Sequence, residues 1–429
     1  MTLEADRLDS WSQRLRQASD RIAGNYPGEG PGRQPVHTVY GGAQLFTSQT
    51  ISKLGELATE FAGNWTASPA DFEKVLGLEP AVAGRVHRAV MGKLAREPVE
   101  DYRIDFEDGY GNRPDDEEDG HAVSTARELA AAMADGALSP FSGIRVKSMS
   151  GELHKRALRT TDRFITTLVD EAGGVPDGFA VTVPKLQDLA QVEVMAEALG
   201  DLESRLGIDR IPMELMVETP QTVIDVDGTV GMRRWVQAGD GRVRGAHFGT
   251  YDYTASLNIT AAHQAMDHPA CDFARHALQV SLAGTGVWLS DGATNVMPVG
   301  ESPAVVHGAM RLHYDHIRHS LSHAYYQGWD LHPAQLVTRF AAVYSFFLEG
   351  LDSAGARLSN FVESAAKATL VGEIFDDAAT GQGLLNYFLR AINCGAIDEA
   401  EATSRTGLTV DELRTRSFLR ILEGRRGSG

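Results

Sequence analysis

Short apolar runs alternate with longer amphipathic segments between residues 36 and 330, and this alternation constrains the fold more than any other feature of the sequence. An apolar run of about five residues, bounded by turn formers, is typical of a buried strand in a parallel sheet. A parallel neighbour requires a crossover, and the segments between the runs have helical length. We count about seven or eight strand–helix units, which predicts a single (β/α)₈ barrel of the TIM type.

The predicted elements follow directly from this pattern. A doubly wound open sheet is the competing fold, but it favours a Gly-rich phosphate turn, and no G-x-G-x-x-G opens a helix here. We predict strands over 36–40, 102–109, 143–148, 179–185, 213–217, 244–249 and 287–289, and helices over about 3–24, 48–60, 70–97, 120–135, 153–173, 188–206, 220–239, 269–283 and 302–327.

Three parts of the chain are expected. Residues 1–35 form an N-terminal helix and a loop rich in Gly and Pro, and residues 36–335 form the barrel, which is the catalytic domain. Residues 336–429 form a C-terminal extension in which only helices are expected.

Composition narrows the class of protein. The 429 residues are 43% hydrophobic and 23% charged, which is ordinary for a globular chain with a large core. A net charge of −18 argues against binding to nucleic acid or to an acidic membrane. There is no long apolar stretch, no secretory signal and no paired spacing of the two cysteines, Cys271 and Cys394. We therefore expect a cytoplasmic protein with free thiols.

Two predicted strands each deliver a carboxylate at or just beyond their carboxyl ends. Glu218 follows the run 213–217, and Asp252 follows the run 244–249. Ligands of α/β folds gather at the carboxyl ends of parallel strands, so these two acids could hold one hard divalent cation. Each acid could instead cap the next helix or pair with an arginine.

Other polar side chains fall at the same predicted strand ends. Several acids beside a few basic groups suit a divalent cation together with an anionic substrate, because the cation balances the carboxylates and an arginine grips a substrate carboxylate with two hydrogen bonds. We interpret the sequence as lacking the H-x-x-x-H, Cys/His and H-E-x-x-H spacings of zinc sites, so zinc is not expected and Mg²⁺ or Mn²⁺ is favoured. The polar residues at strand ends are His37, Tyr40, Asp105, Glu107, Asp108, Arg145, Lys147, Lys185, Glu218, Asp252 and Asp291.

Seven segments in chain order resemble motifs of one enzyme family. They are 104–108 (IDFED), 143–146 (GIRV), 183–186 (VPKL), 217–219 (VET), 248–252 (FGTYD), 291–292 (DG) and 331–335 (LHPAQ). Together they resemble the citrate lyase β-subunit / HpcH–HpaI aldolase superfamily, which includes the malyl-CoA lyases and, more distantly, the malate synthases.

The resemblance implies a TIM barrel that uses Mg²⁺, or Mn²⁺, to make or break a carbon–carbon bond next to a carbonyl. By position in the motifs, Glu218 and Asp252 would be the metal ligands. Arg145 would be catalytic and would bind the carboxylate or carbonyl of an oxo-acid, with Glu107 and Asp108 as catalytic groups near the waters of the metal. Further substrate contacts would come from Lys185, Gly249 and Thr250. Family members form trimers or hexamers, so a homo-oligomer is expected.

Some residues depart from the family pattern or have more than one interpretation. Lys147 stands where the family has Asn, and residues 112–119 form an acidic tract that we interpret as a solvated helix entrance. His37 is a candidate proton shuttle, and His332 is either a packed core residue or a functional one. Lys185 could form a Schiff base in another kind of aldolase, but the acids predicted around it favour ion pairs.

The sequence therefore predicts a metal-dependent carbon–carbon lyase or aldolase. Its substrate would be a short oxo- or hydroxy-acid, free or as a CoA thioester. One alternative is a class II aldolase that uses pyruvate and an aldehyde without CoA. Another is a barrel scaffold without catalysis.

Overall fold

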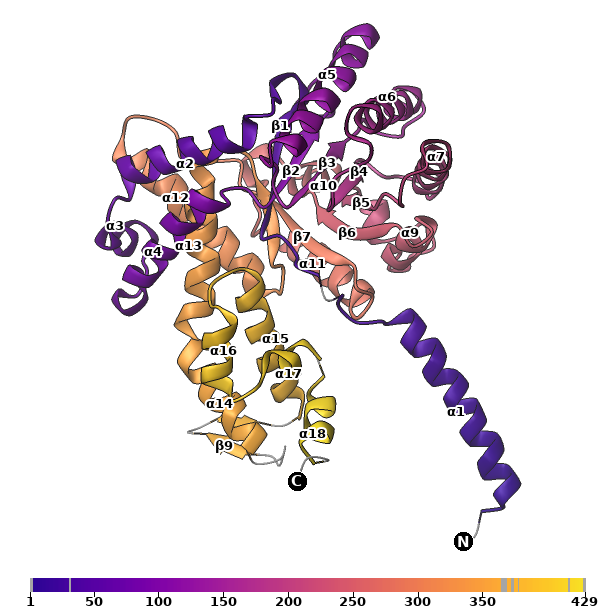
Figure 1. The fold of residues 1–429 in the computed structure, drawn as a ribbon, viewed down its shortest axis with the longest axis vertical. Helices are drawn as coiled ribbons and strands as arrows, with labels where there is room; N and C mark the ends of the chain where they lie inside the picture. Colours follow the sequence, from indigo (N-terminus) through magenta and orange to yellow (C-terminus); the bar gives the residue numbers. More distant parts are fainter. Residues whose placement is uncertain are drawn as a thin grey trace.

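The computed structural model describes residues 3–30, 32–363, 369–371, 374–376, 378–415 and 417–426. Eight parallel strands close into a barrel in which each strand pairs with the next along the chain and β8 pairs with β1 (Figure 1). The predicted TIM barrel is therefore confirmed. The strands are β1 (His37–Gly42), β2 (Asp101–Asp105), β3 (Phe141–Arg145), β4 (Phe179–Val183), β5 (Met213–Val217), β6 (Val243–Phe248), β7 (Trp288–Ala293) and β8 (Gln327–Asp330).

Helices surround the barrel and extend it at both ends of the chain. Around the strands lie α2 (Thr50–Trp65), α3 (Pro69–Leu76), α4 (Pro80–Arg96), α5 (Asp115–Ala134), α6 (His154–Ala172), α7 (Ala190–Leu206), α8 (Pro220–Val223), α9 (Met232–Ala238), α10 (Thr250–Ser256), α11 (Pro269–Leu282), α12 (Pro303–Ser322) and α13 (Pro333–Glu349), with short 3-10 turns η1 (Ala43–Leu45) and η2 (Ala261–His263). Before them comes α1 (Ala5–Asn25), and after them come α14 (Leu351–Glu363), α15 (Ala378–Asn393), α16 (Glu399–Thr406), α17 (Val410–Arg414) and α18 (Phe418–Arg426).

Strand β5 illustrates why these apolar runs form the barrel wall. Met213, Leu215 and Val217 belong to the apolar core, whereas the intervening Glu214 bonds to the interior residue Arg103. All five residues of β5 are buried. A strand that is covered on both faces has a nearly continuous run of apolar residues, and this is the pattern found in residues 213–217.

Below the carboxyl ends of the strands, the barrel interior is filled by a polar network. Arg103 donates to Asp101 (2.6 Å), to Glu214 (2.5 Å) and to the Thr182 hydroxyl (3.0 Å), and its side chain is fully buried. His247 Nδ1 accepts a bond from Trp329 Nε1 (3.1 Å), so its Nε2–H donates to Glu214 (3.0 Å). These satisfied partners close the barrel as a packed plug.

Several elements differ from the sequence-based expectations. The helix expected over 302–327 ends at Ser322, and the eighth strand β8 follows it. The helix expected over 70–97 is two helices, because Gly77 takes a left-handed φ of 65° and Pro80 begins the next helix. The segment 220–239 likewise holds two short helices, α8 and α9.

The acidic tract and the C-terminal extension also require corrections. Helix α5 already begins at Asp115, so most of the acidic tract forms its first turn, where carboxylates meet the positive end of the helix dipole. The expectation of helices alone after residue 334 was wrong, because β9 (Thr369–Val371) and β10 (Ile374–Asp376) form an antiparallel pair. The predicted domain boundary at 335 falls inside α13.

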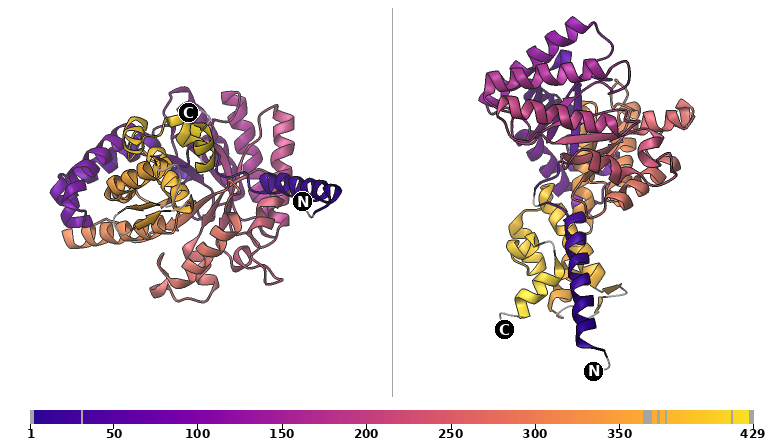
Figure 2. Two further views of the ribbon diagram at one scale, coloured as in Figure 1. Left: turned by 90° about the horizontal axis from the view of Figure 1, so that it is seen from below. Right: turned by 90° about the vertical axis from the view of Figure 1, so that its right-hand side faces the viewer.

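The two terminal parts attach to the barrel in different ways. Helix α1 projects away from the barrel and has no buried residue (Figures 1 and 2). The C-terminal helices pack on α13 and at the amino end of the strands, where Arg390 of α15 donates to Gln34, which precedes β1 (2.7 Å). Among the described helices, none is long and apolar enough to cross a membrane.

Candidate functional site

The end of β2 and the end of β3 are joined by an ion pair. The Arg145 guanidinium donates from Nε to Asp105 Oδ1 (2.7 Å) and from Nη2 to Asp105 Oδ2 (2.6 Å). Burial lowers the pKa of Arg145, but the Asp105 carboxylate outweighs burial, so the net pKa lies well above its ordinary value. Arg145 is therefore a fixed cation, and its remaining nitrogen, Nη1, lies 3.4 Å from Glu107.

Asp105 also shapes the turn that follows β2. Its two oxygens accept bonds from the backbone N–H groups of Glu107 (2.9 Å) and Gly109 (2.7 Å). The sequence analysis listed Asp105 within a motif but gave it no role. Its role becomes visible only when the neighbouring strand brings Arg145 beside it.

Lys185 links three of the acids at the carboxyl ends of the strands. Its ammonium contacts Glu107, Asp108 (2.9 Å) and Asp252 (3.6 Å). Burial alone would lower the pKa of Lys185, but the carboxylates of Glu107, Asp108 and Glu218 together outweigh it and the net shift is upward. The lysine is held as a cation, which suits ion pairing and not Schiff-base chemistry.

The backbone of Lys185 is held in an unusual conformation. Its φ is 51°, in the left-handed region that side chains other than Gly seldom adopt. In this conformation its N–H donates to Glu218 Oε1 (2.6 Å). A strained residue of this kind persists where the surroundings hold it, often at a functional site.

Glu218 is the most perturbed acid of the group. Its side chain is only 2% exposed, and burial together with the nearby Asp252 charge raises its pKa to about 8. Gly249 leaves the space that Glu218 occupies, because a Cβ there would lie 2.6 Å from Glu218 Cβ and 2.7 Å from its Oε2. The carboxyl group is thus packed tightly beside the end of β6.

Glu107 and Asp108 are neighbours whose pKa values shift in opposite directions, and the Glu107 side chain is 10% exposed whereas that of Asp108 is 60% exposed. Burial raises the pKa of Glu107. Burial would also raise the pKa of Asp108, but hydrogen bonds with Glu107 and Lys185 and the charges of Arg145 and Lys185 together outweigh it, so the net shift is downward. Glu107 therefore keeps its proton to a higher pH than an ordinary glutamic acid, beside a more acidic Asp108, and two neighbouring carboxyl groups of unequal pKa suit general acid–base work.

Tyr40 stands between Arg145 and β8. Its ring packs against Trp329, with centroids 4.9 Å apart, and the Arg145 guanidinium lies 4.8 Å from it on another side. Burial raises the pKa of Tyr40, so its hydroxyl stays protonated, and that buried hydroxyl has no hydrogen-bond partner within the described part of the chain. A cavity of about 400 Å³ adjoins it, lined also by Leu331 and His332.

Other candidates from the sequence lie elsewhere. His37 is buried behind the barrel wall, where it donates to Asp330 (2.9 Å), so it does not reach the group of acids. His332 caps α13 by accepting from Ala334 N–H (3.2 Å). Lys147 turns away to the carbonyls of Phe106 and Gly111, both at 2.9 Å.

The remaining family-derived residues have structural partners. The Thr250 hydroxyl is buried 3.6 Å from Met266 Sδ, so any substrate contact from Thr250 would come from its backbone. Asp291 is buried outside the barrel, where it binds Arg275.

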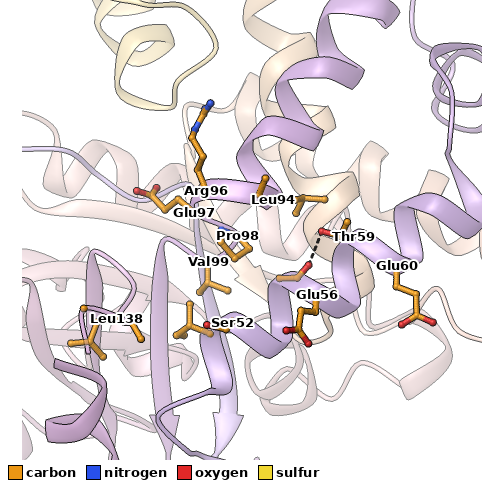
Figure 3. A pocket seen from close by; sticks show the side chains of 15 residues that line it. Ser52, Glu56, Thr59, Glu60, Leu94, Arg96, Glu97, Pro98, Val99 and Leu138 are labelled. Atoms are coloured by element: carbon orange, nitrogen blue, oxygen red, sulfur yellow. Dashed lines mark hydrogen bonds between the residues drawn. The ribbon is translucent and has the colours of Figure 1, made fainter. Parts of the chain in front are cut away.

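A larger groove of about 740 Å³ lies at the opposite end of the strands (Figure 3). It runs between α2 and α4 and includes Pro98, Val99 and Leu138, which precede β2 and β3. Its walls hold Glu56, Glu60 and Arg96, and also Glu97, which is ion-paired with Arg33 and Lys93. Barrel ligands bind at the carboxyl ends, so we place the candidate site there.

The donor atoms at the carboxyl ends fit a hard divalent cation. Glu218 and Asp252 offer carboxylate oxygens, which are the ligands that Mg²⁺ and Mn²⁺ prefer. Asp252 lies close enough to raise the pKa of the buried Glu218. Two like charges held together in this way are relieved by a cation between them.

The fold and this group of residues define the chain as a TIM barrel with charged groups at its carboxyl-end mouth. The chain belongs to the family described as "Domain of unknown function (DUF6986)", whose model matches residues 15–421. No curated protein matches its sequence.

Solved structures share the fold at low sequence identity. A citrate lyase from Burkholderia xenovorans LB400 gives a TM-score of 0.57 at 17% identity, over 88% of this chain and 97% of its own. The malate synthase of Haloferax volcanii, in a magnesium and glyoxylate complex, gives 0.47 at 14% identity, over 89% and 97%. At these sequence identities, the comparison shows that this chain shares the fold of those proteins and nothing further.

Proposed function

We propose that this protein is a Mg²⁺- or Mn²⁺-dependent carbon–carbon lyase or aldolase that acts next to the carbonyl of a short oxo- or hydroxy-acid. One observation carries the proposal. The Arg145 cation, fixed by Asp105, stands at the same end of the barrel as the Glu218 and Asp252 carboxylates. An anion-binding group beside cation-binding oxygens is what an oxo-acid bound to a metal requires.

Arg145 would bind the substrate through the part of its guanidinium that Asp105 leaves open. Nε and Nη2 each donate to Asp105, so a substrate carboxylate or carbonyl oxygen would bind at Nη1, which lies 3.6 Å from Met216 Sδ and 3.4 Å from Glu107. Because Asp105 holds the guanidinium in place, little ordering is needed when the substrate arrives.

Glu218 and Asp252 would hold the metal ion, which supplies positive charge where negative charge develops on the substrate oxygen. Neighbouring residues of the chain hold the Glu218 carboxyl group in position. The Lys185 N–H fixes one Glu218 oxygen, and Gly249 gives the carboxyl group room.

Glu107 and Asp108 would transfer protons in the reaction, and Tyr40 would donate a hydrogen bond. In cleavage, ionised Asp108 accepts the proton of the substrate hydroxyl, the adjacent carbon–carbon bond breaks, and its electron pair forms the enolate of the second fragment. The buried Tyr40 hydroxyl, which keeps its proton, donates a hydrogen bond to the substrate. The enolate carbon then takes up one proton, which the Asp108 and Glu107 pair would deliver after Asp108 has accepted the hydroxyl proton.

The testing experiment is a product assay with Mg²⁺ over pyruvate, oxaloacetate, glyoxylate, malate, acetyl-CoA and malyl-CoA, with aldehydes as co-substrates. We expect bond cleavage or condensation that chelation removes. Turnover of CoA thioesters would assign the lyase, and turnover of pyruvate with an aldehyde would assign the class II aldolase. No turnover, together with no stabilisation by any ligand, would support the scaffold and overturn the proposal.

Variants connect that activity to the site. Glu218→Gln and Asp252→Asn are each expected to lower kcat/KM by at least about 100-fold, because each removes a charged ligand of the metal. Far-UV circular dichroism shows whether the fold is kept. Full activity in both variants would refute the assignment of the metal ligands.

A further inference from the structure

Two helices on the outer side of the barrel bring an aspartate and two histidines together. Asp272 lies on α11, and His319 and His323 lie on α12 and its C-cap. One ligand atom from each of the three lies within 4.8 Å of the others. Asp272 Oδ1 is 2.8 Å from His319 Nε2, and the rings of His319 and His323 have centroids 4.4 Å apart.

The two histidines stand in a spacing that suits joint ligation. His319 and His323 are four residues apart, which places them on the same face of α12. The expectation that the sequence contains no H-x-x-x-H spacing was therefore wrong. His323 Nδ1 lies 2.8 Å from the His319 carbonyl oxygen, so it carries the hydrogen and donates it there. The lone pair of His323 is consequently on Nε2, as in most metal-binding histidines.

The aspartate is held in place by groups behind it. Arg275 Nη1 donates to Asp272 Oδ1 (2.6 Å), while Arg275 Nε donates to Asp291 (2.9 Å). Both Arg275 and Asp291 are fully buried. The Asp272 carboxylate is thus anchored to the barrel wall through β7, so that ligation costs little conformational entropy.

A fourth side chain lies next to this group. His276 is four residues after Asp272 on α11, is exposed, and has its ring centroid 5.2 Å from that of His323. The two helices therefore present a D-x-x-x-H spacing and an H-x-x-x-H spacing toward one another.

We propose that Asp272, His319 and His323 form a binding site for a divalent transition-metal ion of the zinc class, with His276 or water completing the shell. Two imidazoles and one carboxylate are the ligand set of such ions, whereas Mg²⁺ prefers oxygen alone. The bound ion would take the place of the present hydrogen bond between Asp272 and His319. It would join α11 to α12 outside the mouth, independently of the proposed lyase.

Cobalt(II) is the probe, because in a nitrogen and oxygen site of low coordination number it gives visible absorption bands. The full-length protein is titrated in excess Mg²⁺, which keeps hard oxygen sites filled, and zinc is then added to displace the cobalt. We expect one equivalent bound with these bands. The His319→Ala/His323→Ala double variant should weaken cobalt binding by at least about 100-fold, and Asp272→Asn by about 10-fold.

Matched variants separate this site from the others. His263→Ala removes an exposed histidine on η2 and should leave cobalt binding unchanged. Glu218→Gln should also leave it unchanged, which keeps the test distinct from that of the proposed lyase. The proposal is overturned if the double variant binds cobalt as tightly as the parent, or if the parent shows no bands. A double variant that fails to fold is replaced by His323→Gln, judged by the same loss.

Discussion

At the scale of single residues, Arg145 shows how a neighbour decides what a side chain can do. Asp105 takes two of its donor nitrogens and keeps the guanidinium rigid at the barrel mouth. Lysine offers one point charge in place of a planar fork, so it can satisfy Asp105 or a substrate but not both in the same geometry.

Arg145→Lys is accordingly expected to raise the KM or Kd for the oxo-acid by about 10- to 100-fold while the barrel stays folded. Calorimetric titration with the oxo-acid measures this. The control is Arg127→Lys, because Arg127 forms an exposed ion pair with Glu171. This control should leave the affinity for the oxo-acid unchanged. Equal affinity of the Arg145→Lys variant and the parent would exclude Arg145 as the substrate-binding group.

Glu218 gives the mouth a pH dependence. Its pKa is raised from an ordinary value of 4.5 to about 8 in the folded chain. The folded state thus binds this proton more tightly than the unfolded chain, and the free energy of unfolding falls as the pH rises from about 4.5 to about 8. A metal ligand must lose the same proton before it binds.

We therefore expect the Mg²⁺ affinity to rise by up to about tenfold per pH unit below pH 8. Above pH 8 the affinity should level off. Titration calorimetry in two buffers of different ionisation enthalpy would detect the released proton. In Glu218→Gln, the fall in unfolding free energy toward pH 8 should become smaller. A magnesium affinity that does not change between pH 6 and pH 8 would contradict the assignment.

At the scale of elements, the junction of β5 and β6 determines the shape of the site. The two strands run side by side with Val217 opposite Phe248, so the residues that follow each strand meet at the mouth. Glu218 fits there because Gly249 has no Cβ.

Gly249→Ala should push the Glu218 carboxyl out of position and lower magnesium affinity and activity by about 10-fold or more. Gly245→Ala, on the strand that leads to Gly249, is the matched control, because a Cβ there would meet Glu214 Cγ at an ordinary 3.5 Å. Magnesium titration of both variants, with thermal melts, makes the comparison. Equal losses in the two variants would mean that the close approach to Glu218 is unimportant.

The elements also show why some were predicted and others were missed. β5 and β6 were predicted because continuous apolar runs mark strands that are covered on both faces. β8 was missed because it is four residues long and reads Gln-Gly-Trp-Asp, with its polar residues satisfied by the barrel interior and by Arg339. Trp329, which packs on Tyr40, was consequently missed as well.

At the scale of the whole molecule, strand order gathers the candidate site. A closed parallel barrel places all strand ends of one polarity at one rim, so acids from β2, β5 and β6 could be expected to meet. The sequence could not foresee that Lys147 turns away from the mouth, or that His319 and His323 meet Asp272. The first depends on the loop after β2, whose carbonyls bind the Lys147 ammonium, and the second on how α11 and α12 lie outside the barrel; periodicity encodes neither.

The terminal parts are expected to differ in their importance for stability. Helix α1 has no buried residue, so deletion of residues 1–24 should change the melting temperature by no more than about 2 °C. Deletion from residue 350 removes core residues such as Leu358, Phe361 and Phe388 and should abolish soluble folding. Circular dichroism melts and size-exclusion chromatography test both. A large destabilisation by the first deletion would contradict the structure.

The polar plug of Asp101, Arg103 and Glu214 has a kinetic consequence for a reaction of two substrates. The plug fills the barrel below the mouth, and the described C-terminal helices pack at the far end, so substrates of the proposed reaction would enter through the mouth. Arg145 is 5% exposed, so a substrate bound to it would lie deep in that mouth. Binding would then follow a compulsory order, in which the oxo-acid enters first and leaves last.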